Sequence, residues 1–237
     1  MTREFEIRRE VELPATPEEV WDAIATREGL AAWLFDQGAE PDAAGAEVWD
    51  RPRRLLIRIP PAADGATQAF EYVIEPRPGD RAVLRFVHSG FLGESWADEL
   101  DFGELTGHGW DMYLFTLAEY LRHFRGRRAT YVEAEAPPPS SRPDAWPALL
   151  DALGEPGDLA AGDRVRLTPD GMAPIEGVAD YVAPHYLGVR TPDALIRFHG
   201  RSLIGMPIAV GLHLFDPGVD AAAAGDAWRA WLARVFP

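Results

Sequence analysis

Three side chains in the first half of the chain could perform acid–base chemistry if they share a pocket: His88, Tyr72 and Arg9. Period-two alternation places His88 at the end of an apolar strand face, where an imidazole can serve as a polar contact for a ligand or as a general base. Arg9 interrupts the apolar face of a second predicted strand, and Tyr72 lies on that of a third. The alternative for His88 needs no ligand, because a half-buried histidine can bond to the turn that follows it.

Three histidines in the second half could bind a metal. His185, His199 and His213 recur every 14 residues on successive predicted strands. If those strands pair in suitable register, the imidazoles could converge on one ion. No HExxH signature accompanies them, and the acidic run over residues 94–104 lacks the spacing of a calcium loop. We therefore predict neither a metal nor a cofactor.

The composition excludes most covalent catalysis. The chain has no Cys and no Lys, so disulfides, thiolate nucleophiles, Schiff bases and the phosphate-binding lysine loop are excluded. None of its five serines lies in a Gly-x-Ser-x-Gly elbow. The net charge of −15 disfavours nucleic acid and anionic lipid as partners.

The chain also shows no targeting or membrane signal. Its N-terminus is charged from the start, unlike a secretory signal. No apolar run approaches the roughly 20 residues of a membrane helix. We expect a cytoplasmic protein without membrane insertion.

The elements that must position these residues follow from periodicity and capping. Residues 5–13 alternate between an apolar and a charged face, which predicts a strand wet on one side. Thr16-Pro17-Glu18-Glu19 predicts a capping box that opens a helix, and Thr26 can cap a second, short helix. Strands are predicted over residues 47–50, 54–59, 68–75 and 81–88, with Ser89-Gly90-Phe91 ending the last one. A stripe from Trp110 to Phe124 predicts a closing helix over residues 107–124, and the class is α+β.

This order of elements resembles the START-like helix-grip (SRPBCC) superfamily, in which a curved antiparallel sheet grips a long C-terminal helix. Three stretches resemble the group named after activators of the heat-shock chaperone ATPase: residues 11–21, residues 84–91, and Gly109-Trp110 with Tyr120-Leu121. The resemblance spans residues 5 to about 126. It implies a cavity between the concave face of the sheet and the closing helix.

Aromatic and apolar side chains are expected to line that cavity, because ligand pockets are mostly apolar with few polar groups. The alternative is that such residues are simply core. The predicted ligand-binding residues are Trp33, Phe35, Trp49, Ile57, Phe70, Tyr72, Phe86, His88, Trp96, Trp110 and Leu114.

The second half is predicted to repeat the first in shortened form. We expect domains at residues 1–128 and 129–237, with Pro137–Pro139 and the residues after them as a linker. Strands are predicted over 129–136, 164–168, 177–190, 194–200 and 207–215, with helices over 144–153 and from Gly225 to the end. A family-specific extension that packs on the first domain is the alternative.

Three functional hypotheses follow. The first is a protein that binds a small apolar or aromatic molecule. The second is an enzyme of the polyketide cyclase or aromatase type, in which His88, Tyr72 or Arg9 would supply acid–base help. The third is a protein-interaction or co-chaperone-like module. The protein could form a homodimer under any of them.

Overall fold

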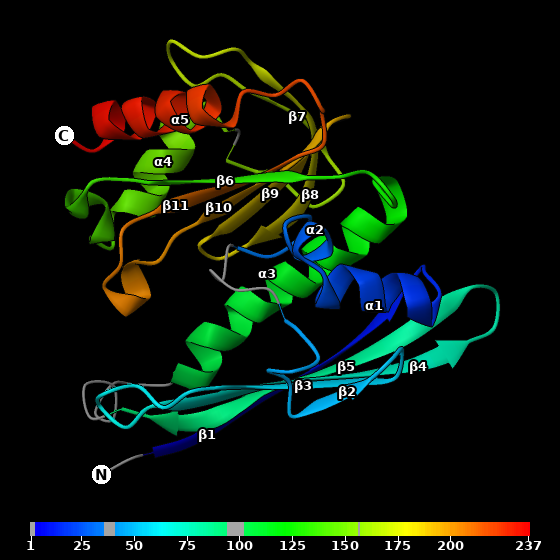
Figure 1. The fold of residues 1–237 in the computed structure, drawn as a ribbon. Helices are drawn as coiled ribbons and strands as arrows, with labels where there is room; N and C mark the ends of the chain where they lie inside the picture. The colour runs from blue at the N-terminus through cyan, green and yellow to red at the C-terminus, as the bar shows by residue number, and fades with distance from the viewer. Residues whose placement is uncertain (1–2, 36–40, 94–101, 156) are drawn as a thin grey trace. The chain divides into compact units, whose positions relative to one another are not determined.

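The computed structural model describes residues 3–35, 41–93, 102–155 and 157–237, with side chains from Thr106 onward in the closing helix of the first half. The chain divides into two compact units, Met1–Gly126 and Arg127–Pro237. Each unit contains one antiparallel sheet and its own helices (Figure 1). The predicted α+β class is confirmed. Within the described residues, no helix is long and apolar enough to cross a membrane.

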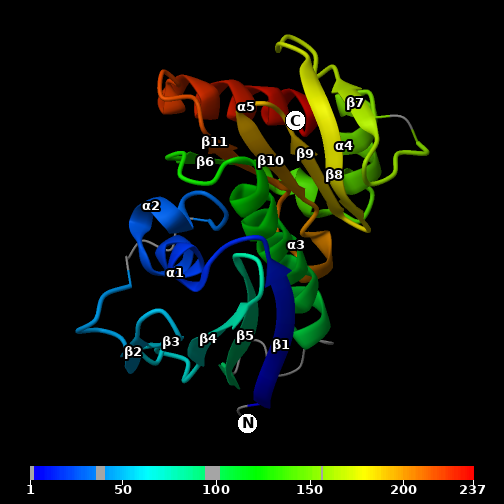
Figure 2. The ribbon, with the colours of Figure 1, turned by 90° about the vertical axis from the view of Figure 1, so that its right-hand side faces the viewer.

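The first unit has a five-stranded sheet in the order β1-β5-β4-β3-β2 (Figure 2). Its strands are β1 (Arg3–Leu13), β2 (Val48–Asp50), β3 (Arg54–Ile59), β4 (Thr67–Arg77) and β5 (Arg81–Leu92). The prediction that β5 ends at Ser89 is wrong, because the strand pairs with β1 as far as Leu92. Gly90 allows this continuation, since a Cβ there would lie 1.9 Å from the Thr67 carbonyl oxygen.

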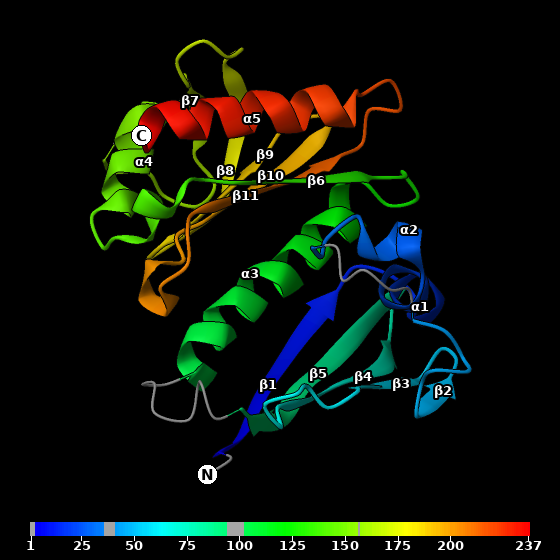
Figure 3. The same ribbon diagram turned by 60° about the vertical axis from the view of Figure 1, so that its left-hand side comes forward.

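Three helices complete the first unit: α1 (Pro17–Ala25), α2 (Arg27–Leu30) and α3 (Phe102–His123). The predicted capping box is present, because the Glu19 amide donates to the Thr16 hydroxyl and the Thr16 amide donates to the Glu19 carboxylate. The helix α3 begins five residues before the predicted Gly107 and packs against β1 (Figure 3). Its predicted apolar stripe is buried throughout: Trp110, Leu114, Leu117, Leu121 and Phe124.

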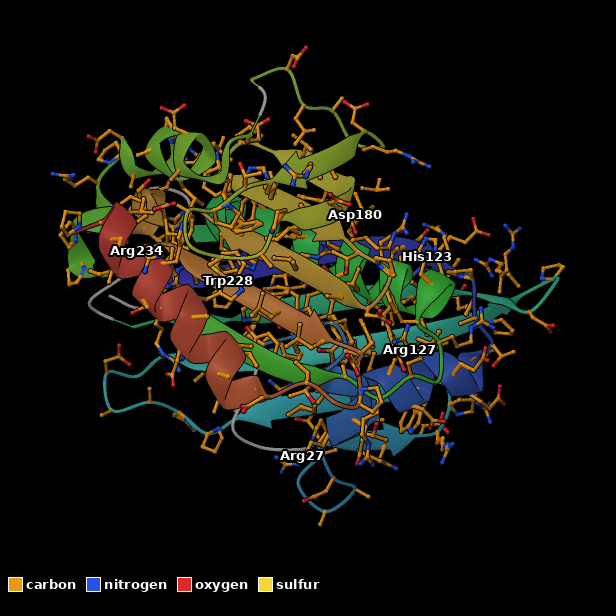
Figure 4. All side chains as sticks on the ribbon, turned by 90° about the horizontal axis from the view of Figure 1, so that it is seen from above. Arg27, His123, Arg127, Asp180, Trp228 and Arg234 are labelled. Atoms are coloured by element: carbon orange, nitrogen blue, oxygen red, sulfur yellow. The ribbon has the colours of Figure 1, made fainter. Side chains whose placement is uncertain are left out.

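The second unit has a six-stranded sheet in the order β6-β11-β10-β9-β8-β7. Its strands are β6 (Thr130–Glu135), β7 (Arg164–Leu167), β8 (Ile175–Ala183), β9 (Tyr186–Arg190), β10 (Ala194–His199) and β11 (Ala209–Leu214). Its helices are α4 (Ala145–Leu153) and α5 (Ala221–Val235), with short 3₁₀ helices at Pro138–Ser141 and Ser202–Ile204. Apolar residues of α4, α5 and one sheet face form its core, including Trp228 of α5 (Figure 4).

Two predictions about the second half are wrong. Residues 177–190 form two strands rather than one, because Pro184 and His185 make a two-residue turn between Ala183 and Tyr186. The proline stretch is a 3₁₀ helix of the second unit rather than a linker. The Ser140 hydroxyl holds it in place by donating to the Pro137 carbonyl and accepting from the Ile208 amide.

Both sheets share one topology. In each, the first strand lies beside the last, the intervening strands follow in reverse order, and a helix closes the unit. The tandem helix-grip architecture is therefore present. The second unit has the shorter closing helix, 15 residues in α5 against 22 in α3, but one more strand.

Candidate functional site

The candidate site is the face of the first sheet that carries Phe70, Tyr72, Phe86 and His88, called the inner face below. Strand register aligns its side chains in two rows across the sheet, because directly paired residues of antiparallel strands point to the same side. One row contains Ile7, His88, Phe70 and Ile57. The next contains Arg9, Phe86, Tyr72 and Leu55.

Trp110 of α3 joins the helix to these rows. Its ring centroid lies 4.2 Å from that of Phe86 and 5.8 Å from that of Phe70. Its indole Nε1 donates to His88 Nδ1 at 3.0 Å. The helix is thus bound to the sheet by aromatic contacts and one buried hydrogen bond.

His88 is buried, and both of its ring nitrogens are engaged. Nδ1 accepts from Trp110, so Nε2 carries the proton and donates to Gln68 Oε1 at 3.2 Å. The ring also stacks on Phe70 at 4.5 Å and meets the edge of Phe5 at 4.9 Å. Burial lowers the pKa of His88 to about 4, which keeps the imidazole neutral. The predicted bond to the following turn is wrong, because the partners come from α3 and β4.

The Tyr72 hydroxyl, unlike the ring nitrogens of His88, has no hydrogen-bond partner among the described residues. The side chain is only 3% exposed, and its ring lies 5.1 Å from that of Phe86. Burial alone raises the pKa of Tyr72. The hydroxyl oxygen is not one of the fully buried, unpaired polar atoms, which among the described residues are His185 Nδ1 and Ser202 Oγ, so it keeps a contact with solvent that a ligand could replace.

Arg9 is held by a carboxylate rather than left open to a substrate. Its guanidinium makes two bonds to Asp111 of α3, one of them from Nη2 to Oδ2 at 3.1 Å. The side chain passes so close to α3 that a Cβ at Gly107 would lie 2.6 Å from Nη2. The pair therefore connects β1 with the first half of α3 and balances the arginine charge.

The remaining predicted ligand-binding residues fall into three groups. Trp33 and Leu114 are buried, and the Trp33 indole donates to the Ala23 carbonyl at 2.9 Å. Ile57, Phe35 and Trp49 are half-buried; Phe35 lies 5.4 Å from Tyr113 of α3, and Trp49 lies 5.2 Å from Trp21 of α1. Trp96 lies outside the described residues, as does the acidic run up to residue 101.

Sequence reasoning did not select two residues that complete the site: Gln68 and Tyr113. Gln68 could have been found from period two, because it lies on the Phe70 face of β4. Tyr113 depends on the rotation of α3 about its axis, which only packing fixes.

The three histidines of the second unit do not converge. His213 pairs with Leu195, and His199 lies four residues further along β10. At the usual rise per residue, the Cα atoms of the two histidines are separated by roughly 13 Å along the strand direction. His185 lies in the β8–β9 turn, with its ring 6.4 Å from that of Trp146 of the core. Burial, two nearby arginines and His213 lower the pKa of His199 to about 3. No cluster of three metal-ligating side chains occurs in the described part of the chain.

The second unit instead carries a buried ion pair that the sequence did not reveal. Arg197 of β10 makes two bonds to Asp180 of β8, at 2.8 and 3.0 Å (Figure 4 labels Asp180). Gly188 on the strand between them leaves the space, since a Cβ there would lie 2.6 Å from both Arg197 Nη1 and Asp180 Oδ1. This pair lies on the sheet face opposite the apolar core.

No protein-family model and no curated protein matches the sequence. Among solved structures, the Aha1 dimer protein from Colwellia psychrerythraea is 18% identical with a TM-score of 0.38, covering 52% of this chain and 99% of its own. DynU16, from the dynemicin biosynthetic locus, is 16% identical with a TM-score of 0.40, covering 98% and 95%. The di-domain ARO/CYC protein BexL of the BE-7585A pathway is 13% identical with a TM-score of 0.38, covering 98% of both chains.

The fold assignment rests on the chain's own topology. In each unit the strand order, the helices after the first strand and the closing helix are those of a helix-grip. What the site does must be argued from its own residues.

Proposed function

We propose that the first unit binds a small apolar or aromatic molecule on its inner face, with the Tyr72 hydroxyl as the polar contact. The observation that carries the proposal is that hydroxyl, which belongs to a side chain only 3% exposed beside Phe86 and forms no hydrogen bond with the described residues. A ligand oxygen or nitrogen would satisfy it. Such a site is apolar with one oriented polar group, as ligand sites generally are.

Half-buried apolar side chains beside this position support entry of a ligand. Ile57 is two residues from Leu55, the β3 partner of Tyr72, and Trp49 pairs with that same Leu55 from β2. Both keep part of their surface accessible, whereas Tyr72 and Phe86 are buried. A flat molecule could therefore bury its own apolar surface against these two side chains.

The residues that would serve a cyclase or aromatase are engaged in other bonds. Arg9 is paired with Asp111, and the lone pair of His88 Nδ1 is used by the Trp110 indole. A general base needs a free lone pair within reach of the substrate proton. These bonds favour a binding protein over an enzyme.

Equilibrium dialysis of the full chain against two matched, uncharged probes tests the proposal. 2-Naphthol can bond to the Tyr72 hydroxyl, whereas naphthalene offers only apolar surface. Tyr72→Phe is expected to weaken 2-naphthol binding roughly five- to tenfold, as loss of one buried hydrogen bond does, and to leave naphthalene binding unchanged. Tyr131→Phe is the control, because its hydroxyl donates to Glu133 in the second unit.

Two results would contradict the proposal: neither probe binds the wild-type protein, or Tyr72→Phe binds 2-naphthol as tightly as the wild type does. Native mass spectrometry of the gently purified protein then identifies any co-purified molecule.

A further inference from the structure

A groove of about 500 Å³ lies on the second unit, on strands β7, β8 and β9. Its size is within the range of small-molecule sites. It lies at the edge of the second sheet, where β7 is the outermost strand (Figure 2). Its lining includes Arg164, Arg166, Glu176, Val178 and Arg190.

The charge of this groove is opposite to that of the chain. Three arginines and a single glutamate line it, in a protein of net charge −15. The glutamate is already used, because Glu176 pairs with Arg166 at 2.9 Å. Asp193, the next acid along the chain from the groove, pairs with Arg127 at 2.6 Å. Arg164 therefore adds a positive charge to the groove that no acid in its lining balances.

Strand register places Arg164 and Arg190 on the same sheet face, on either side of Val178. Val178 of β8 pairs with Arg164 of β7 on one side and with Arg190 of β9 on the other. All three side chains consequently point to the same face, with the two arginine Cα atoms about 10 Å apart across two strand spacings. Arginine side chains are long enough to reach an anion held above Val178 from both sides.

The guanidinium of Arg164 is available to bind an anion. No hydrogen bond or ion pair to its guanidinium occurs within the described ranges. A groove of about 380 Å³ on the outer face of the first sheet provides the contrast. Both arginines of that face have a carboxylate: Arg8 pairs with Glu6, and Arg85 with Glu10.

We propose that the β7–β9 groove binds the carboxylate or phosphate group of a small molecule, with Arg164 and Arg190 as the charged contacts and Val178 as an apolar floor. The planar guanidinium fork matches both groups by paired hydrogen bonds. This proposal is independent of ligand binding by the first unit.

Calorimetric titration of the full chain at low salt with benzoate and with inorganic phosphate tests it. Arg164→Gln and Arg190→Gln are each expected to weaken binding roughly three- to tenfold, the usual range for a partly exposed charged hydrogen bond. Arg164→Lys should fall between wild type and Arg164→Gln, because it keeps the charge and loses the fork. Tighter binding of benzoate identifies a carboxylate on an apolar body, and tighter binding of phosphate a phosphoryl group.

Arg85→Gln is the matched control, since it removes an arginine from the neutralised groove of the first unit. The proposal is overturned if neither anion binds, or if Arg164→Gln binds as tightly as Arg85→Gln and wild type. It is also overturned if a short DNA duplex binds far more tightly than either anion with a steep salt dependence, because the groove would then serve nucleic acid.

Discussion

The two units present chemically different surfaces to their closing helices. In the first, the sheet face that meets α3 carries the His88–Trp110 hydrogen bond and the Tyr72 hydroxyl, which forms no hydrogen bond with the described residues. In the second, the face that packs against α4 and α5 is apolar and buried, and the Arg197–Asp180 pair lies on the other side of the sheet. One topology can thus place its polar groups on either side of the sheet.

The largest difference in stability between the two units is expected from removing one partner of an ion pair. Asp180→Ala is expected to destabilise the protein by about 3–5 kcal/mol, because it removes the carboxylate from a buried arginine. Asp111→Ala should cost less than about 1 kcal/mol, since that pair is partly solvated. The side chains are 1% and 4% exposed in the first case and 33% and 36% in the second.

Urea unfolding followed by circular dichroism measures both variants. Equal losses would contradict the difference in burial on which this comparison depends.

Lowering the pH should reduce the free energy of unfolding of the first unit, because the buried His88 must then take up a proton. The folded pKa of about 4 lies below the ordinary value of 6.5, so the unfolded chain binds a proton that the folded chain rejects. Stability contributed by neutral His88 is therefore complete above pH 6.5 and is lost as the pH falls toward 4, by on the order of 3 kcal/mol. His199, with a pKa of about 3, acts in the same direction in the second unit.

Nuclear magnetic resonance titration of the His88 imidazole checks this value directly. His108→Gln serves as the control, because its side chain is 57% exposed and the variant should keep the pH dependence. An imidazole at position 88 that titrates near 6.5 would show that the ring is not buried as described.

The smallest difference in stability is expected from removing the N-cap side chains of α1 and α4, the α-helices that follow the first strand of each unit. Thr16→Ala is expected to cost about 1 kcal/mol, because Thr16 caps α1 through a complete capping box. Asp144→Ala should cost little, since the Asp144 side chain makes no cap bond to α4. Thermal unfolding of the two variants compares them, and a larger loss in Asp144→Ala would reverse the assignment.

Local patterns were enough to predict much of the first unit. Alternation identified the apolar faces of β1, β4 and β5, and the stripe from Trp110 to Phe124 identified α3. The errors occurred where local signals compete. Ser89-Gly90-Phe91 reads as a turn yet continues β5, and Pro184-His185 is a turn inside a stretch that reads as one strand.

The sequence by itself determined the class, the apolar faces and the caps, because these depend on residues close together in the chain. Only the tertiary structure decided the partners: that Trp110 would use the lone pair of His88, that Asp111 would hold Arg9, and that Tyr72 would form no hydrogen bond with the described residues. It also decided that the histidines of the second unit would form no metal-ligating cluster among those residues. Each of these depends on strand register or on the rotation of a helix, and register and rotation are set by packing across the whole unit.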